Sequence, residues 1–490
     1  MVSIEEIAVF AKKKGFVFPS SEIYGGFSGF FDYGPLGVEL KNNIKNSWWK
    51  SMVHDRENVV GIDGSIISSE AVWKASGHLE NFADVLVECK KCKKKVRLDH
   101  LIEDQLKIKT EGMNADEMGA LLKKNNIKCN ECKKGEFGNP IKFNLMFNTA
   151  VGPHGNEIGY LRAETAQMIF TNFKNVVDTS RVKLPFGIAQ IGKAFRNEIS
   201  PRNFLFRMRE FEQMEMEFFM HPEKKNDCLI FKEIENVKAN VLTSKEQPDG
   251  KMQKMTIAQL LDKKIIKTKW HAYWIGYRYK WFLDLGITPE RLRLREHVPD
   301  ELSHYSLATW DIEYNYEFGW KELEGIADRT NFDLKQHAKF SKIDLSYFDP
   351  ETNERVVPHV IEPSVGVDRI LLTLMIDSYF EEEVKGEKRV VLKLKPNVAP
   401  FRVAILPLVK KDGLAEKATE LFNEVKNKFN CFYDESGSIG RRYRRMDEVG
   451  TPFCITVDHQ TLEDGTVTIR NRDTMEQKRI KIKEIEKSLS

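Results

Sequence analysis

The sequence has no apolar run long enough to cross a membrane. None of its 490 residues lies in a stretch that approaches the roughly 20 apolar residues of a membrane-spanning helix. Residues 1–6 become acidic at once and lack the basic and then apolar pattern of a secretion signal. We therefore expect a cytoplasmic protein that makes no contact with a membrane.

An excess of charge of one sign is also lacking. The 76 Lys and Arg residues nearly balance the 73 Asp and Glu residues, and the net charge is +3. A chain so balanced is not a general coat for nucleic acid, although local basic surfaces remain compatible with it. The composition, 41% hydrophobic and 30% charged, is that of a folded protein. The length predicts roughly three domains.

Cysteine is scarce and odd in number, with seven residues, which argues against a disulfide scaffold. Four of them form two C-x-x-C pairs that could supply four thiolates to one tetrahedral metal: Cys89, Cys92, Cys129 and Cys132. Structural zinc is our interpretation, and a pair of reduced dithiols is the alternative. A helix over 113–125 is expected between the pairs. The remaining cysteines have apolar neighbours and are expected in the core: Cys228, Cys431 and Cys454.

The two common nucleotide-binding loops are absent as well. There is no G-x-x-x-x-G-K-[ST] loop and no dinucleotide fingerprint in a suitable context. Residues 195–219 instead predict a long antiparallel hairpin that is rich in arginine. Strand alternation places Gln213, Glu215 and Glu217 on one face. A phosphate site and a salt-bridged surface hairpin both fit this spacing. Arg369 is expected in the first turn of a buried helix over 365–376, where free backbone amides favour an anion.

The wider pattern predicts an α+β fold with several parts. Hydrophobic spacing predicts helices over 4–14 and 38–53, and the Lys-rich segment 223–300 is expected to be a peripheral helical insertion. The region 89–142 is expected to be a metal-bound insert. Two prolines near 396–400 indicate a boundary, after which alternating β and α segments predict a small α/β domain over 398–490.

Several stretches resemble one known family. Residues 195–198 with the arginine-rich hairpin are similar to motif 2 of the class II aminoacyl-tRNA synthetases, and 366–369 are similar to motif 3. Blocks at 15–26, 162–167, 209–215, 319–329 and 362–364 resemble the glycyl-tRNA synthetases of the homodimeric type. The resemblance implies a six-stranded antiparallel catalytic sheet, formed by 1–88 and 143–397, a four-cysteine insertion of the zinc type over 89–142 and an anticodon-binding domain over 398–490.

The resemblance also implies a site for ATP. Arg196 would hold the α-phosphate, Arg369 the γ-phosphate and Glu322 a magnesium ion, and these residues would be catalytic. The implied ATP contacts are Arg196, Asn197, Glu198, Phe206, Arg207, Met208, Arg209, Glu210, Phe211, Glu322, Leu323, Gly366, Val367, Asp368 and Arg369. Such catalysis depends on positioning and electrostatics and requires no side-chain nucleophile.

A glycine site is implied in the same way. Its residues would be Arg97, Glu164, Phe211, Glu212, Gln213, Met214, Glu215, Glu362, Pro363, Ser364, Val365 and Gly366. Among these, Glu215, Glu362 and Ser364 match the residues that surround the ammonium group. Arg97 departs from the family pattern because Leu98 follows it, and a structural salt bridge is the alternative for this arginine. His154 and His337 are interpreted as structural or surface residues.

The implied partners are glycine, tRNA(Gly) and a second copy of the chain. Lysines of the metal insert suit phosphates near the acceptor stem, and a basic loop over 440–445 suits the anticodon region. The alternative there is a solvated basic loop. Two other functions stay open at this point: a class II ligase for another small amino acid, and a non-catalytic, nucleic-acid-binding descendant of the fold such as a polymerase accessory subunit.

Overall fold

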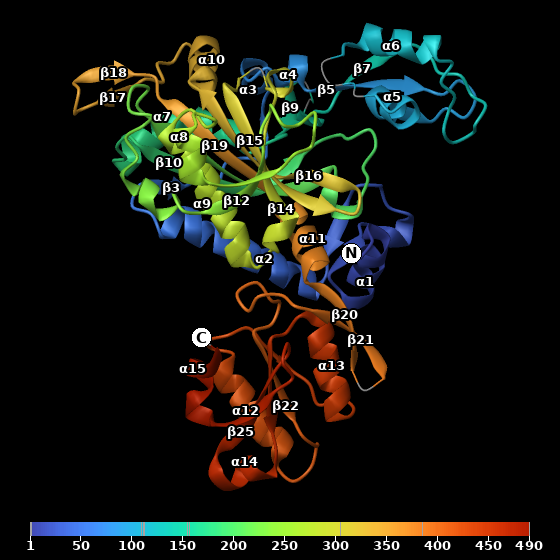
Figure 1. Ribbon diagram of the computed structural model, residues 1–490, viewed down its shortest axis with the longest axis vertical. Coiled ribbons are helices and arrows are strands. Elements are labelled where there is room, and N and C mark those ends of the chain that lie inside the picture. Colours follow the sequence, from blue (N-terminus) through green and yellow to red (C-terminus); the bar gives the residue numbers. More distant parts are fainter. Residues whose placement is uncertain are drawn as a thin grey trace.

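The computed structural model describes residues 2–108, 110, 113–153, 155, 157–303, 305–384 and 386–489. His154 lies outside the described residues. A large upper part carries the main sheet, and a smaller C-terminal part lies below it (Figure 1). Within the described ranges, no helix is both long enough and apolar enough to cross a membrane.

A nine-stranded sheet forms the centre of the upper part. Its order is β13 (Gln253–Thr256), β12 (Lys238–Leu242), β14 (Leu292–Glu296), β15 (Ala308–Tyr316), β16 (Gly319–Thr330), β19 (His359–Gly366), β11 (Glu210–Met220), β10 (Phe186–Phe195) and β3 (Val59–Gly61). The six strands from β14 to β10 are antiparallel throughout, as expected. The sheet has more strands than expected, because β12 and β3 add to it in parallel.

The two faces of this sheet are covered differently. Side chains alternate along β11, and Met214, Met216 and Phe218 enter the largest core cluster. That cluster includes residues of α1 (Ile4–Lys14), α2 (Pro35–Trp49), α9 (Lys269–Leu285) and α11 (Val367–Ser378). The opposite face packs a smaller cluster with α7 (Ala166–Ser180) and α10 (Phe332–Ser341). The part of that face not covered by helices is available to ligands.

The predicted helices of the upper part are present with shifted ends. The helix over 4–14 is α1, which ends at the left-handed Gly15. The second helix, α2, begins at Pro35 rather than at residue 38, because proline suits the first helical position. The helix expected over 365–376 is α11, which starts at Val367 and is buried along most of its length.

The expectation of a peripheral helical insertion over 223–300 is wrong. This segment supplies β12, β13 and β14 to the main sheet, and its long helix α9 has a buried, aromatic-rich core face. Trp270 and Trp274 of α9 pack against Phe218 with ring centroids 4.7 and 5.1 Å apart. The shorter helix α8 (Ile257–Asp262) follows β13. The segment is therefore part of the unit built around the main sheet rather than an appendage.

Smaller sheets and helices complete the upper part. The metal insert combines β5 (Ala83–Glu88), β6 (Lys95–Arg97) and β7 (Ile141–Asn144) with α5 (Leu98–Leu106) and α6 (Ala115–Lys124), and α6 confirms the helix predicted there. A second sheet pairs β4 (Ile67–Ser69), β9 (Glu157–Leu161) and β8 (Asn148–Val151). The remaining elements are β1 (Val17–Pro19), β2 (Phe31–Tyr33), α3 (Glu70–Ala75), α4 (His78–Asn81), β17 (Tyr347–Asp349) and β18 (Glu354–Val356).

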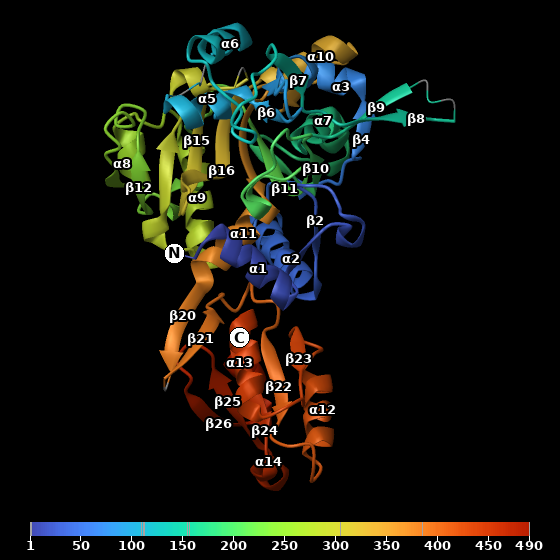
Figure 2. The same ribbon diagram turned by 90° about the vertical axis from the view of Figure 1, so that its right-hand side faces the viewer.

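The C-terminal part is the small α/β unit that the sequence predicts. A five-stranded mixed sheet has the order β23 (Cys431–Tyr433), β22 (Val403–Pro407), β24 (Phe453–Val457), β25 (Thr466–Asn471) and β26 (Gln477–Lys481). Its helices are α12 (Leu414–Val425), α13 (Ile439–Val449), α14 (His459–Asp464) and α15 (Ile485–Leu489). The hairpin of β20 (Tyr379–Val384) and β21 (Glu387–Leu392) lies between the two parts (Figures 1 and 2).

The basic stretch 440–445 is not a loop, because it lies within α13. Arg442 is buried, and its Nη2 donates to Leu408 O at 3.1 Å. Arg445 pairs with Asp434 at 2.5 Å. Buried Asp447 on the same helix binds Arg389 of β21 and Arg470 of β25. Several of these side chains therefore hold the domain together, while Arg441 is exposed.

Candidate active site

A cleft opens on the sheet face that the core helices leave uncovered. Its walls come from the loop of the β10–β11 hairpin, from β16 and from the junction of β19 with α11. The lining residues are Arg196, Glu198, Leu205, Phe206, Arg207, Met208, Phe211, Gln213, Glu322, Ser364, Val365, Gly366, Asp368 and Arg369. Residues predicted separately for ATP and for glycine therefore line one cavity. Leu205, which the sequence analysis did not single out, also lines it.

Arg196 is fixed on one side of the cleft just beyond β10. Its backbone N–H donates to Arg209 O at 2.9 Å, which closes the base of the hairpin loop. Its Nε donates to Ala163 O at 3.1 Å. The guanidinium lies over the rings of Phe82 and Phe211, with centroids 5.4 and 5.2 Å away. These contacts orient the arginine and leave its terminal nitrogens for an anionic ligand.

Arg369 lies at the opposite wall, in the first turn of α11. Its Nη1 donates to Glu322 O at 2.7 Å and lies 3.6 Å from the Glu322 carboxylate. Its guanidinium also lies over the Phe206 ring at 4.5 Å. The positive end of the helix dipole adds to the charge of this arginine. The predicted position of Arg369 at a helix N-terminus is confirmed.

Asp368, the neighbour of Arg369, connects the cleft to α2. Its buried carboxylate accepts from Lys41 Nζ at 2.8 Å, from Glu212 N at 2.6 Å and from the Tyr33 hydroxyl. Burial opposes ionisation, but Lys41 outweighs it and lowers the pKa of Asp368. Burial and the Asp368 charge raise the pKa of Tyr33 well above its usual range. The start of α11 is thereby anchored beneath the cleft.

Glu215 is buried and contacts two residues of the cleft lining, Gln213 and Ser364. One carboxylate oxygen accepts from Thr165 N and Ala166 N, both at 2.8 Å, and from Thr165 Oγ1. The other oxygen accepts from Gln213 Nε2 at 2.9 Å and from Ser364 Oγ at 2.5 Å. The side chain of Glu215 is thus held in one orientation, because five donors surround it.

A second buried carboxylate, Glu362, is held by an arginine that the sequence analysis did not single out. Arg329 Nη1 donates to both Glu362 oxygens at 2.9 and 2.8 Å, and its other nitrogens bind Asp333. Burial raises the pKa of Glu362, and Arg329 opposes that shift. Arg329 is the last residue of the block 319–329, which resembles the family. Its ion pair with Glu362 is long-range and leaves no local signal in the sequence.

Glu164 completes the acidic cluster beside these two. It lies 3.4 Å from His78 Nε2 and accepts from Gln167 Nε2 at 2.9 Å. Burial acts to raise the pKa of Glu164, but His78, Arg329 and Gln167 outweigh it, and the pKa is lowered. His337 is buried and bonds to Gln167 Oε1 at 2.8 Å, so its structural interpretation is confirmed.

Glu217 lies two residues beyond Glu215 on the same face of β11. Neither of its carboxylate oxygens has a hydrogen-bond partner among the described residues. Its side chain is fully buried. Burial, followed by the charge of Glu362, raises the pKa of Glu217 well above its usual range. A raised pKa favours the neutral form of the Glu217 carboxyl, which limits repulsion within the acidic cluster.

Other predicted residues lie outside the cleft. Arg209 donates to Ser28 O and Glu198 O, Glu210 pairs with Lys193, and Glu212 pairs with Lys41 and Lys45. Leu323, Val367, Met214 and Pro363 are buried in the sheet and its core. Asn197 lines a neighbouring groove instead. These positions adjoin the motifs in sequence, but they are not among the residues that line the cleft.

Arg97, predicted near glycine, does not line the cleft. It pairs with Asp84 at 2.7 Å and with Asp99 at 2.5 Å, which agrees with the salt-bridge alternative. His100, in the following helix α5, contacts Arg202 Nη2 at 3.3 Å. These contacts join the metal insert to the tip of the β10–β11 hairpin.

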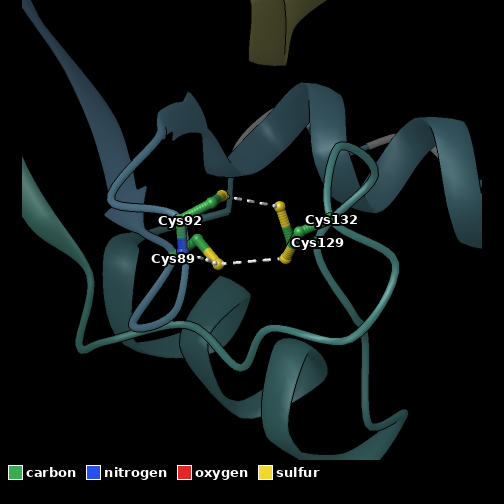
Figure 3. A group of neighbouring side chains, drawn as sticks. All are labelled: Cys89, Cys92, Cys129 and Cys132. Carbon is green, nitrogen blue, oxygen red and sulfur yellow. Dashed lines mark hydrogen bonds between the residues drawn. The ribbon is translucent and has the colours of Figure 1, made fainter.

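The four paired cysteines converge in the metal insert (Figure 3). The Sγ atoms of Cys89 and Cys132, and those of Cys92 and Cys129, are each 3.7 Å apart. This spacing is too long for a disulfide and agrees with the roughly 3.8 Å between thiolates on a tetrahedral zinc. A Cβ at Gly135 would lie 2.1 Å from Cys89 Sγ, so the cluster requires glycine there. The cluster is compatible with zinc.

The other cysteines are remote from this cluster. Cys228 and Cys454 are buried, as predicted, and Cys431 is partly buried against the C-terminal core. Burial raises the pKa of Cys228 and of Cys431 to about 12, so both remain thiols.

Comparisons with known proteins agree with this architecture. Residues 153–379 match the family described as tRNA synthetase class II core domain (G, H, P, S and T), and residues 402–490 match the anticodon binding domain. The glycine–tRNA ligase of Caldanaerobacter subterraneus subsp. tengcongensis is 49% identical over 100% of this chain and 98% of its own length. Those of Clostridium acetobutylicum and Bacillus anthracis are 49% and 48% identical, each over 99% of this chain and 98% of their own. The chain belongs to the glycine–tRNA ligase family.

Proposed function

We propose that this chain ligates glycine to tRNA(Gly) in two steps. A glycine carboxylate oxygen attacks the α-phosphorus of ATP and pyrophosphate leaves. The terminal ribose hydroxyl of the tRNA then attacks the glycyl carbonyl carbon, and AMP leaves. The observation that carries this proposal is one cleft lined by Arg196 and Arg369, in which the lining residues Gln213 and Ser364 also bind the buried carboxylate of Glu215.

The arginines suit the triphosphate. Arg196 would neutralise charge at the α-phosphate, and Arg369 would hold the γ-phosphate so that pyrophosphate leaves in line. Phe211 offers an aromatic face beside Arg196, suited to the adenine. Glu322 is exposed by 51% at the side chain and next to Arg369, where its carboxylate could hold Mg2+. Bound Mg2+ would neutralise phosphate charge.

The acidic cluster suits an amino acid without a side chain. An ammonium group is the part of glycine that can be recognised, and Glu215, Glu362 and Ser364 offer oxygens for it, with Glu164 and Gln213 beside them. A Cβ on the substrate would meet side chains held by the network around Glu215 and Arg329. A methyl group in a simple apolar pocket discriminates by only about 1–3 kcal/mol, so a rigid and charged pocket is needed for more.

The other parts suit the remaining partners. We assign 1–88 and 143–397 to the catalytic domain, 89–142 to a zinc-bound insert and 398–490 to an anticodon-binding domain. The insert presents exposed lysines for tRNA phosphates, namely Lys90, Lys91, Lys93, Lys94, Lys95, Lys123, Lys124, Lys133 and Lys134. We also propose a homodimer in the cytoplasm, where thiols stay reduced.

Amino-acid-dependent exchange of pyrophosphate into ATP tests the proposal. The exchange is measured for each amino acid in turn, without tRNA. We expect rapid exchange with glycine and little with alanine or serine. Absence of exchange with glycine overturns the assignment, and preference for another small amino acid identifies a different ligase.

A further inference from the structure

Two buried glutamates, Glu217 and Glu362, lie opposite each other on neighbouring strands of the main sheet. Strands β11 and β19 run antiparallel, and their register pairs Glu215 with Ser364. Continuing this register by two residues places Glu217 opposite Glu362. Side chains that are directly opposite on one face of a sheet have Cβ atoms about 5 Å apart. The two residues are 0% and 6% exposed, so their carboxyl groups are neighbours away from water.

The two carboxyl groups differ in their hydrogen bonds. Arg329 Nη1 donates to both oxygens of Glu362, at 2.9 and 2.8 Å. Neither oxygen of Glu217 has a partner among the groups that the structure describes. A buried carboxylate without a donor is costly, whereas a protonated carboxyl is neutral and can donate its proton to a neighbouring carboxylate. Glu217 is therefore the member of the pair that suits a proton.

The elements packed around this pair contribute mainly negative charge. Ile188 of β10, which lies opposite Glu217 on the other side of β11, is uncharged. Arg329 of β16 binds Glu362 and also buried Asp333 of α10. The other titratable groups near the pair are Glu215 of β11, Glu164 before α7, Tyr305 before β15 and, one contact further out, His78 of α4 and His337 of α10.

This balance of charge favours one retained proton. Glu217, Glu362 and Asp333 place three carboxyl groups around the guanidinium of Arg329. Like charges at this separation disfavour ionisation of both members of a pair. In agreement, burial and then the charge of Glu362 raise the pKa of Glu217 well above its usual range.

Glu362 connects the pair to the cleft. It lies two residues before Ser364, which lines the cleft and donates to Glu215 at 2.5 Å. The proposed function assigns the ammonium group of glycine to these three residues. An ammonium group bound there would bring positive charge next to the pair, and an opposite charge within about 4–6 Å favours the ionised form of a carboxyl. Bound glycine and the retained proton therefore oppose each other.

We propose that Glu217 and Glu362 share one proton in the glycine-free protein and release it when the ammonium group of glycine binds. The carboxyl O–H bond breaks, its electron pair stays on the carboxylate, and the proton passes to the buffer. Before binding, the shared proton limits repulsion between the acids; after binding, the added negative charge attracts the ammonium group. Glu217 acts through Glu362 and is a positioning residue. This inference rests on the proposed function, because it takes glycine as the ligand.

Calorimetry of glycine binding to the full chain, without ATP or tRNA, counts the proton. The titration is repeated in two buffers with different enthalpies of ionisation, because a released proton adds the heat of its uptake by the buffer. We expect the wild type to release up to about one proton per glycine near pH 7. Glu217→Gln keeps the shape of the side chain but cannot titrate, and it should release none. Glu354→Gln, on the exposed part of β18, is the matched control and should behave as the wild type.

The same linkage determines how glycine affinity depends on pH. Because binding releases a proton, a higher pH favours binding, and the wild-type Kd for glycine should fall by up to about tenfold per pH unit between pH 6 and 8. Glu217→Gln should match the wild type at pH 6, where the pair is protonated, and bind more weakly at pH 8. Any titration of glycine itself affects both proteins equally.

Two calorimetric results overturn the inference: glycine binding by the wild type without proton release, and equal release by the wild type and Glu217→Gln. If Glu217→Gln does not fold, infrared difference spectra of the wild type decide. The C=O band of a protonated carboxyl should disappear when glycine is added, and its persistence overturns the inference. Absence of glycine-dependent pyrophosphate exchange would overturn the proposed function instead, while calorimetry would still count the protons released by glycine.

Discussion

Glu215→Gln is the substitution that most directly tests how glycine is selected. The introduced amide has the shape of the carboxylate but no charge. With its oxygen toward Thr165, it still accepts from the Thr165 and Ala166 N–H groups. Its NH2 then faces Gln213 and Ser364. Gln213 can turn its own amide, since its Oε1 has no hydrogen-bond partner among the residues described, and the Ser364 hydroxyl oxygen can accept. We therefore expect the chain to fold.

The expected magnitude follows from the charge that is lost. A hydrogen bond to a charged group contributes about 1.5–3 kcal/mol, which corresponds to a roughly 10- to 150-fold rise in the KM for glycine. The proposed ATP contacts are Arg196 and Arg369, neither of which binds Glu215, so the KM for ATP should change little. Glu215→Ala is a poorer test, because it would leave five buried donors without an acceptor.

The assay is glycine-dependent pyrophosphate exchange with glycine and ATP varied separately. Glu354→Gln, an exposed carboxylate on β18, is the matched control and should leave both KM values unchanged. Thermal unfolding checks that Glu215→Gln folds as the wild type does. An unchanged KM for glycine, or equal rises for glycine and ATP in a folded variant, would refute the assignment of Glu215 to the ammonium group.

Three further predictions address ATP, the metal and pH. Arg369→Ala should raise the KM for ATP by roughly 10- to 150-fold through the lost phosphate contact, and an unchanged value in exchange assays would contradict the role of Arg369. Cys132→Ser should release zinc and expose the insert to limited proteolysis while the nine-stranded sheet stays folded; equal zinc content in both proteins, measured by atomic absorption, would count against the site. Burial raises the pKa of Glu217, so the folded chain keeps a proton that the unfolded chain loses above about pH 4.3. Urea unfolding between pH 5 and 8 should therefore show stability falling with pH by at most about 1.4 kcal/mol per unit, and Glu217→Gln should remove that contribution; the same slope in both proteins would contradict it.

Local patterns predicted the parts of the fold that local physics determines. Helix α1 has the Ser3 cap, the hydrophobic spacing and the terminal Gly15 that define a helix from neighbouring residues. The cysteine pairs predicted their own convergence, because thiolate spacing in a C-x-x-C turn already suits a metal. The motif arginines on either side of the cleft were identified for a similar reason, since each stands at the end of a recognisable element.

The segment 223–300 shows where local patterns fail. Its edge strand β13 and the neighbouring strand β12 carry exposed lysines. Such lysines protect a sheet edge and also resemble the solvated face of a helix. The sequence of β14 does show the alternation typical of a strand: Leu292 and Leu294 are buried and alternate with Arg293 and Arg295. In α13, buried Arg442, Met446 and Val449 have helical spacing that the cluster of arginines obscured.

The long-range partners of the site could not be predicted in this way. Arg329 meets Glu362 only because β16 pairs with β19, and Arg97 meets Asp84 only because β6 folds back on β5. Such pairs depend on sheet register, and a single sequence does not show which residues lie opposite one another.

Register is therefore the property that connects the hydrophobic core to glycine selection. Glu215 pairs with Ser364, and Gln213 pairs with Gly366, across β11 and β19. The intervening Met214 and the following Met216 are fully buried on the other face. A shift of β11 by one residue would drive both carboxylate-face residues into the core and both methionines into the cleft, at the cost of burying polar groups without partners. The apolar face of β11 thus stabilises the one alignment that assembles the proposed glycine pocket. Substitutions that weaken the packing of Met214 should for that reason impair glycine binding before they unfold the chain.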